Sequence, residues 1–146
     1  MFEDNKVKKT LFAALAVFSM AGGAQAAVQS YDCVVDSVEE SGWIPTRVLL
    51  SLDPEARKAR AYDGYINHAH EQPIDVKFKT VRGKYRMNWR LAVPSQGSGS
   101  VRVNYTATLT PGSNEFLIKA SFPMNNFANM PRGVGSCKAI KGESLY

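Results

Sequence analysis

The sequence predicts an all-β protein, a small antiparallel up-and-down meander of about eight strands that closes into a barrel. Three observations lead to this prediction. Short apolar–polar alternations recur every ten residues or so, separated by Pro, Gly, Asn and Asp. Neighbouring alternations pair in a consistent register. The only two cysteines, Cys33 and Cys137, lie near the two ends of the alternating region, so one disulfide is expected to join the first and last strands.

The first residues have the features of a secretory signal peptide. Three lysines precede an apolar run at 11–20, and Ala24-Gln25-Ala26 is a small-x-small cleavage site. We therefore predict a signal peptide at 1–26 and a single all-β domain at 27–146. The mature protein is then expected in the periplasm or outside the cell. No later segment is long and apolar enough to be expected to span a membrane.

The cysteines fit this location. In an exported protein an even pair of cysteines indicates a disulfide. A bridge from Cys33 to Cys137 would close a loop of about 100 residues and stabilise the fold by about 4–5 kcal/mol in the chain-entropy model. A metal pair or a catalytic thiol is disfavoured, because neither cysteine has a nearby His or a Cys-x-x-Cys spacing.

The alternations predict eight strands in order. They are expected near 30–38, 43–53, 59–66, 74–81, 84–93, 101–110, 115–122 and 136–141. The hairpin that turns at Arg82-Gly83 is the most strongly specified, because apolar residues then oppose apolar ones and polar residues oppose polar ones. Its predicted pairs are Phe78–Met87, Val76–Trp89, Ile74–Leu91, Lys79–Arg86, Lys77–Asn88 and Asp75–Arg90.

The same pairing continues through the next two strands. The predicted pairs are Val93–Val101, Leu91–Val103, Trp89–Tyr105, Met87–Ala107, Leu109–Phe116, Ala107–Ile118 and Val103–Phe122. Four consecutive strands thus share one apolar face, as in a one-sided meander. Closure of the barrel would bring the first strand beside the last and Cys33 beside Cys137. A two-sheet β-sandwich is the alternative, because alternation alone does not separate the two folds.

The polar side of these strands is rich in cations. The predicted basic cluster comprises Lys77, Lys79, Lys84, Arg86, Arg90 and Arg102. Such a cluster suits an anionic partner, for example a phosphorylated lipid, an acidic glycan or an acidic protein surface. Nucleic acid is not expected, because the protein is exported and no aromatics interleave on this face. The alternative is a solvated strand face that simply deters aggregation.

The segment 122–135 lacks both the helical and the strand period. Its candidate docking residues are Phe122, Met124, Phe127, Met130 and Arg132. An irregular segment of this length in a compact domain is often functional. In one interpretation it folds over an open end of the barrel and its apolar side chains plug it. In the other it is a docking loop with adaptable Met and Phe contacts.

No catalytic or cofactor site is predicted. The only histidines, His68 and His70, are weak metal candidates, since an extended segment would direct both to one face and carboxylates such as Asp63 or Glu71 would have to complete the site. No serine lies in a nucleophile elbow, and no carboxylate pair is nominated for acid–base work. We expect no cofactor.

In outline the chain resembles small periplasmic barrel proteins such as the lysozyme inhibitors of the MliC type, which also place one cysteine just after the leader and another near the end. The resemblance covers architecture only. The short Ser-Gly-x-x-Tyr-type motif of those inhibitors is absent, and "YDGYINHAH" at 62–70 does not replace it. No inhibitory residue is carried over.

The leading hypothesis is therefore an exported, non-enzymatic binding module for an unidentified protein or an anionic envelope component. It would use either segment 122–135 or the basic cluster. The alternatives are a carrier of a small lipophilic ligand inside the barrel and, with less support, a metal-dependent hydrolase.

Overall fold

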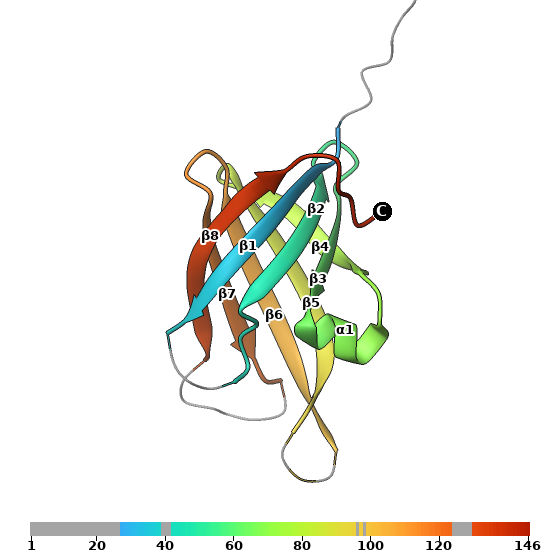
Figure 1. Cartoon of the computed structure of the whole chain (residues 1–146). Helices are drawn as coiled ribbons and strands as arrows, with labels where there is room; N and C mark the ends of the chain where they lie inside the picture. The colour runs from blue at the N-terminus through green and yellow to red at the C-terminus, as the bar shows by residue number, and fades with distance from the viewer. Residues whose placement is uncertain (1–26, 39–41, 96, 98, 124–129) are drawn as a thin grey trace, which may run out of the picture.

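The computed structural model describes residues 27–38, 42–95, 97, 99–123 and 130–146. The predicted signal peptide, 1–26, lies outside these residues, as do Met124 and Phe127. The described chain forms a closed barrel of eight antiparallel strands, in which each strand pairs with the next and the last pairs with the first (Figure 1). The predicted fold class is confirmed, and closure excludes the sandwich alternative.

Each predicted strand has a counterpart. The elements are β1 (Gln29–Ser37), β2 (Arg47–Asp53), β3 (Lys58–Asp63), α1 (Gly64–His70), β4 (Ile74–Val81), β5 (Lys84–Pro94), β6 (Ser100–Thr110), β7 (Glu115–Ser121) and β8 (Arg132–Ile140). β2 begins later than predicted, at Arg47 instead of 43, after a loop that contains Pro45, which cannot donate to a strand ladder. Within the described ranges, no helix is long and apolar enough to cross a membrane.

The predicted register is confirmed through most of the meander. The β4–β5 ladder contains Phe78–Met87, Lys79–Arg86 and Lys77–Asn88, and the β5–β6 and β6–β7 ladders contain all but one of the pairs predicted there. Four predicted pairs were wrong, because the ladders end before them: Val76–Trp89, Ile74–Leu91, Asp75–Arg90 and Val103–Phe122. Asp75 forms an ion pair with Arg60 of β3 instead, at 3.1 Å.

The prediction of a strand at 59–66 followed by an extended loop was wrong at its end. β3 stops at Asp63, and α1 follows. The carboxylate of Asp63 caps the helix by accepting from the Ile66 N–H at 2.8 Å. Glu71 ends it in the left-handed conformation. The fully buried Ile66 anchors this short helix against the barrel, which local alternation does not reveal.

β8 begins four residues earlier than predicted, so segment 122–135 is shorter than expected. Gly133 and Gly135 fall inside the segment predicted to be irregular, but they are strand residues paired with β1 and β7. A Cβ on Gly135 would lie 1.9 Å from the carbonyl oxygen of Val34. These glycines therefore permit close contact between β8 and β1.

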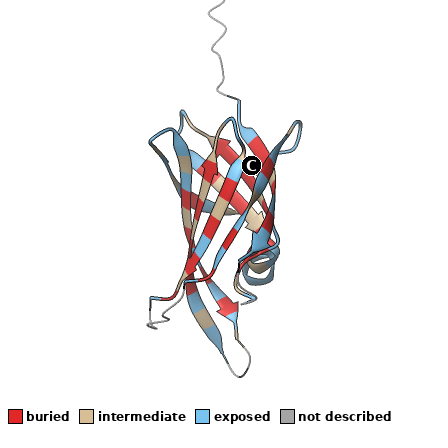
Figure 2. Cartoon of the chain, turned by 90° about the vertical axis from the view of Figure 1, so that its left-hand side faces the viewer, coloured by how far each residue is buried: buried red, intermediate tan, exposed pale blue. Residues whose placement is uncertain are grey.

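The barrel interior is packed with side chains. Buried and exposed residues alternate along the strands (Figure 2). Leu50, Met87, Leu109 and Ile118 are at most 1% exposed. The disulfide between Cys33 and Cys137 joins directly paired residues of β1 and β8, as predicted. A disulfide fits a protein that works outside the reducing cytoplasm.

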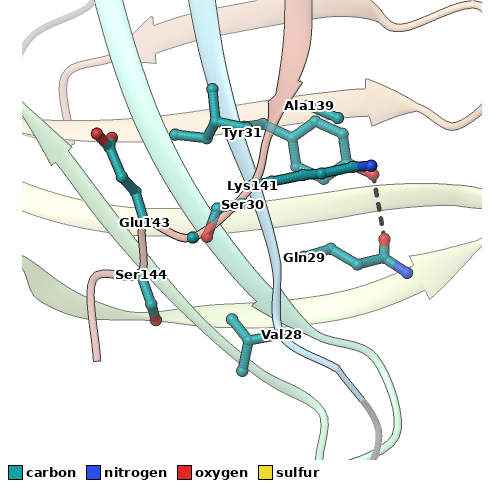
Figure 3. Close-up of a pocket in the computed structure, with 10 residues that line it drawn as sticks. Val28, Gln29, Ser30, Tyr31, Ala139, Lys141, Glu143 and Ser144 are labelled. Atoms are coloured by element: carbon teal, nitrogen blue, oxygen red, sulfur yellow. Dashed lines mark hydrogen bonds between the residues drawn. The ribbon is translucent and has the colours of Figure 1, made fainter.

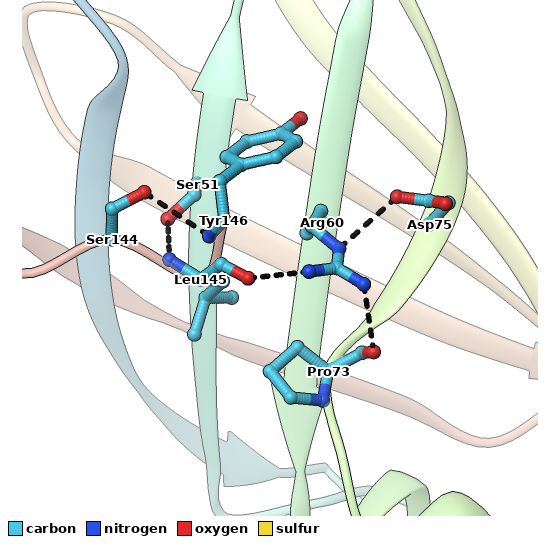
Figure 4. A network of polar contacts seen from close by, with 7 residues as sticks. All are labelled: Ser51, Arg60, Pro73, Asp75, Ser144, Leu145 and Tyr146. Atoms are coloured by element: carbon cyan, nitrogen blue, oxygen red, sulfur yellow. Dashed lines mark hydrogen bonds and ion pairs between the residues drawn. The ribbon is translucent and has the colours of Figure 1, made fainter.

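The last residues of the described chain cover the outer surface of β1–β3 (Figure 4). The N–H of Leu145 donates to Ser51 Oγ at 2.9 Å, and Arg60 donates to the Leu145 carbonyl at 2.7 Å. The Arg60 guanidinium also lies over the ring of Tyr146. Ser51 is in turn hydrogen-bonded to Ser30. We call residues 141–146 the C-terminal segment.

Candidate functional site

The barrel brings the predicted cations together on the outside of β4, β5 and β6. All six are exposed: Lys77, Lys79, Lys84, Arg86, Arg90 and Arg102. We call this set the basic face. The ladders set Lys79 directly opposite Arg86, and Lys77 opposite Asn88. The alternation predicted the composition of this face because successive strand residues point to opposite sides.

The basic face has almost no acidic counterpart. β5 and β6 contain no Asp or Glu. β4 contains one, Asp75, and it is paired with Arg60. Within the described part of the chain, none of the six cations forms an ion pair. Lys84 does line a pocket together with Glu115 and Asp36. The charge of the other five cations faces solvent without a paired anion and favours an anionic ligand.

A shallow hollow of about 540 Å³ lies on the basic face. Its outward-pointing lining residues are Lys77, Asn88, Arg90, Asn104, Thr106 and Ser121. Thr106 Oγ1 donates to Asn88 Oδ1 at 2.9 Å, and Arg90 Nε donates to Asn104 Oδ1 at 2.7 Å. Sequence reasoning identified the two cations but missed the amides. The polar alternation of β6 was the available signal.

The structure separates the residues of the predicted docking loop. Phe122 is 9% exposed and packs edge-on against Trp43, with ring centroids 5.1 Å apart. Met130 is 58% exposed. Arg132 is the first residue of β8 and not part of a loop. Met124 and Phe127 lie outside the described residues. Phe122 is thus buried and Met130 exposed, and the choice between a plug and a docking loop stays a prediction.

The histidines do not share one face, contrary to the prediction from an extended segment. His68 and His70 both lie on α1 and are exposed. Two positions on a helix differ by about 200° in direction. Asp63, considered as a further ligand, is buried and caps the helix. Among the described residues, no three His, Cys, Asp or Glu side chains lie close enough to hold a metal ion.

A buried polar cluster beside α1 was missed by sequence reasoning. Burial raises the pKa of Asp63 to about 6, although backbone N–H groups of Tyr65 and Ile66 oppose this shift. Burial also raises the pKa of Tyr105, with the Asp63 charge adding to the effect. The Tyr105 ring stacks with the rings of Tyr65 and Trp89, and its hydroxyl donates to the Trp43 carbonyl at 2.8 Å. These contacts fix α1 and the β1–β2 loop to the barrel.

Another pocket, of about 690 Å³, lies between the start of β1 and the C-terminal segment (Figure 3). Its lining residues are 28–31 and 139–144. The Tyr31 hydroxyl donates to Gln29 Oε1 at 3.1 Å. Lys141 and Glu143 are its only charged lining residues, so it has no excess of either charge. This balance gives it no preference for an anion or a cation.

These features define the class of protein: a disulfide-closed, eight-stranded antiparallel barrel with a basic outer face. Comparison of the chain with models of known protein families, with curated proteins and with solved structures finds no match. These comparisons give no support to the predicted resemblance to periplasmic lysozyme inhibitors.

Proposed function

We propose that this protein is an exported, non-enzymatic binding module that holds an anionic partner on its basic face. The observation that carries the proposal is the exposed positive charge of that face, whose cations form no ion pair with a described acidic residue. Its six cations are exposed, and two of its three strands contain no acidic residue. Lys79 and Arg86 are directly opposite each other, an arrangement that is mildly unfavourable for the fold itself. An anionic ligand would relieve this repulsion.

Export is part of the proposal. The signal-peptide pattern at 1–26 and the disulfide together support a periplasmic or secreted location. In that setting, anionic partners include acidic envelope polymers, anionic lipid headgroups and acidic proteins.

The two alternatives have less support. A lipophilic carrier needs a cavity inside the barrel, whereas Met87, Trp89 and Tyr105 are buried and pack in the interior. A metal-dependent hydrolase needs converging ligands, whereas α1 directs His68 and His70 apart.

The test compares binding of the oxidised 27–146 protein to washed cell-envelope material at low and high salt. One variant carries Lys79→Glu and Arg86→Glu on the basic face. A control variant carries Lys58→Glu and Lys138→Glu, which are exposed residues outside that face and change the net charge equally. Thermal melts first establish that both variants fold.

We expect salt-sensitive binding by the parent protein and the control, and its loss in the basic-face variant. Equal loss of binding in both variants would mean that binding depends only on net charge, and this would contradict the proposal. Absence of binding by the parent protein at low salt would also contradict it.

A further inference from the structure

The hollow on the basic face presents hydrogen-bond donors. The amide oxygen of Asn88 accepts from Thr106, and that of Asn104 accepts from Arg90. Both residues line the hollow, and their amide nitrogens remain available as donors because neither bonds to another described residue. The ammonium group of Lys77 and the terminal guanidinium nitrogens of Arg90 add donors with positive charge. A ligand that fits must supply acceptors and negative charge, as carboxylate and sulfate groups do.

The cations extend from the hollow in a line. On β5, outward positions are two residues apart, so Lys84 and Arg90 are separated by roughly 20 Å along the strand. Lys77 and Lys79 lie beside this line on β4, opposite Asn88 and Arg86. A single small anion would use only one part of such a band. A chain with several regularly spaced charges would use its whole length.

The neutral residues beside this band suit sugars. The outward positions of β6 include Asn104, Thr106 and Thr108, and these lie opposite Arg90, Asn88 and Arg86 of β5. Amide and hydroxyl groups both donate and accept hydrogen bonds, and sugar hydroxyls do the same. The face therefore alternates ionic and neutral polar contacts.

Other polyanions fit less well. Single-stranded nucleic acid needs exposed aromatic rings on which bases stack, but Trp89 and Tyr105 point inward and are buried. A protein face that binds a lipid surface is expected to carry exposed apolar side chains that enter the membrane interface. The exposed large hydrophobic residues of the described chain lie on other segments: Val28, Val34, Val38, Met130, Val134 and Tyr146.

We infer that the basic face binds a linear acidic polysaccharide, with one carboxylate or sulfate of the chain held between Lys77 and Arg90 in the hollow. This inference rests on the proposed function and specifies its ligand class. The polysaccharide lies along β5, with Arg86 and Lys84 contacting further charges.

The experiment measures binding of the oxidised 27–146 protein by fluorescence anisotropy to five labelled probes at low salt. The probes are a uronic-acid monomer, a linear polyuronate of about six sugars, a heparin oligosaccharide of equal length, single-stranded DNA and vesicles containing phosphatidylglycerol. The hollow variant carries Lys77→Gln and Arg90→Gln. The control carries Lys58→Gln and Lys138→Gln, with the same change in net charge.

We expect the polyuronate or the heparin oligosaccharide to bind more tightly than the monomer, the DNA and the vesicles. The hollow variant should bind that oligosaccharide about tenfold more weakly, equivalent to about 1.4 kcal/mol. The control should change its Kd by less than about threefold, because its charges lie away from the site.

Equal weakening by both variants would overturn the inference. So would preferential binding to DNA or vesicles. If neither oligosaccharide binds but envelope binding is still lost in the Lys79→Glu, Arg86→Glu variant, the ligand class is wrong and the proposed function stands. If envelope binding is absent as well, both fail.

Discussion

The outer surfaces of β1–β3 and β4–β6 are built from the same strand alternation, but they are used differently. On β1–β3, the outward-pointing Ser30 and Ser51 are only 6% and 0% exposed. Both line a pocket together with residues 142–145 of the C-terminal segment, and Figure 4 shows this segment beside Ser51. On β4–β6, no segment of the described chain covers the cations, and all six are exposed. We call these the covered side and the open side.

The difference between the covered side and the open side indicates that the first contributes to stability and the second to binding. On the covered side, polar groups beneath the C-terminal segment have partners within the chain: Ser30 with Ser51, Ser51 with Leu145, and Arg60 with Asp75. On the open side, the cations lack anionic partners within the described residues. Substitutions on the covered side should therefore reduce stability, and substitutions on the open side should chiefly reduce binding.

The largest expected effect concerns the seam between β1 and β8. Replacing both Cys33 and Cys137 with Ala should lower the free energy of unfolding by about 2–5 kcal/mol, because the unfolded chain loses its cross-link. Denaturant titration of both proteins measures this. The open-side variant Lys79→Gln with Arg86→Gln should stay within about 0.5 kcal/mol of the parent. A comparable loss in that variant would remove the distinction between the two sides.

A single methyl group tests the same seam. Gly135→Ala should cost about 3 kcal/mol, at the upper end for overpacking, because the new Cβ would meet the backbone of Val34. Gly64→Ala is the matched control, because a Cβ there meets nothing within 4 Å. Denaturant titrations, through their midpoints and slopes, measure the free energy of unfolding of both variants. If the two alanines have equal effects, the close contact of β8 with β1 is not what requires glycine.

Asp63, at the end of β3, should make the stability depend on pH. Its pKa is about 6 in the folded protein, above the unfolded value of about 3.9. The folded state therefore holds the proton more tightly, and this contribution to stability is complete below pH 4 and is lost as pH rises through 6.

Asp63→Asn removes that dependence while an amide can still cap α1. The variant should gain about 2–3 kcal/mol relative to the parent between pH 4 and pH 7. Denaturant titrations of both proteins at pH 4, 5.5 and 7 measure the difference. A difference that does not change with pH would show that the carboxyl titrates normally in the folded protein.

The smallest expected effect compares one arginine from each side. Arg60→Ala should cost about 1–2 kcal/mol, because the carbonyls of Leu145 and Pro73 lose their donors. Arg90→Ala should change stability by less than about 0.5 kcal/mol, because its hydrogen bond is exposed. Thermal melts of the two variants test this, and hydrogen exchange at Leu145 reports release of the C-terminal segment. Equal melts would mean that this segment adds nothing to the covered side.

The sequence predicted the strands and most of their register because each pairing must match apolar to apolar across a short turn. Phe78–Met87 and Trp89–Tyr105 are such pairs. It failed at α1, because seven residues carry too weak a helical period and the helix depends on burial of Ile66. It failed at Gly133 and Gly135, because glycine signals both a loop and a close strand contact.

The sequence predicted part of the candidate site, because strand alternation assigns each side chain to one face of the sheet. The positions of Lys77, Lys79, Arg86 and Arg90 follow from alternation, which is a local property of the chain. The donor orientation of the Asn88 and Asn104 amides does not, because it depends on hydrogen bonds to Thr106 and Arg90 across strands.

By itself the sequence determined a meander of strands with one apolar and one cationic side, since the period of two assigns each side chain to a side. Closure of that meander into a barrel was shown by the structure. Only the tertiary structure decided which outer surface is covered and which stays open. The contacts of Leu145 and Tyr146 with Ser51 and Arg60 join residues about 90 positions apart. No local pattern records such contacts, because they form only after the barrel has brought β2 and β3 beneath the C-terminal segment.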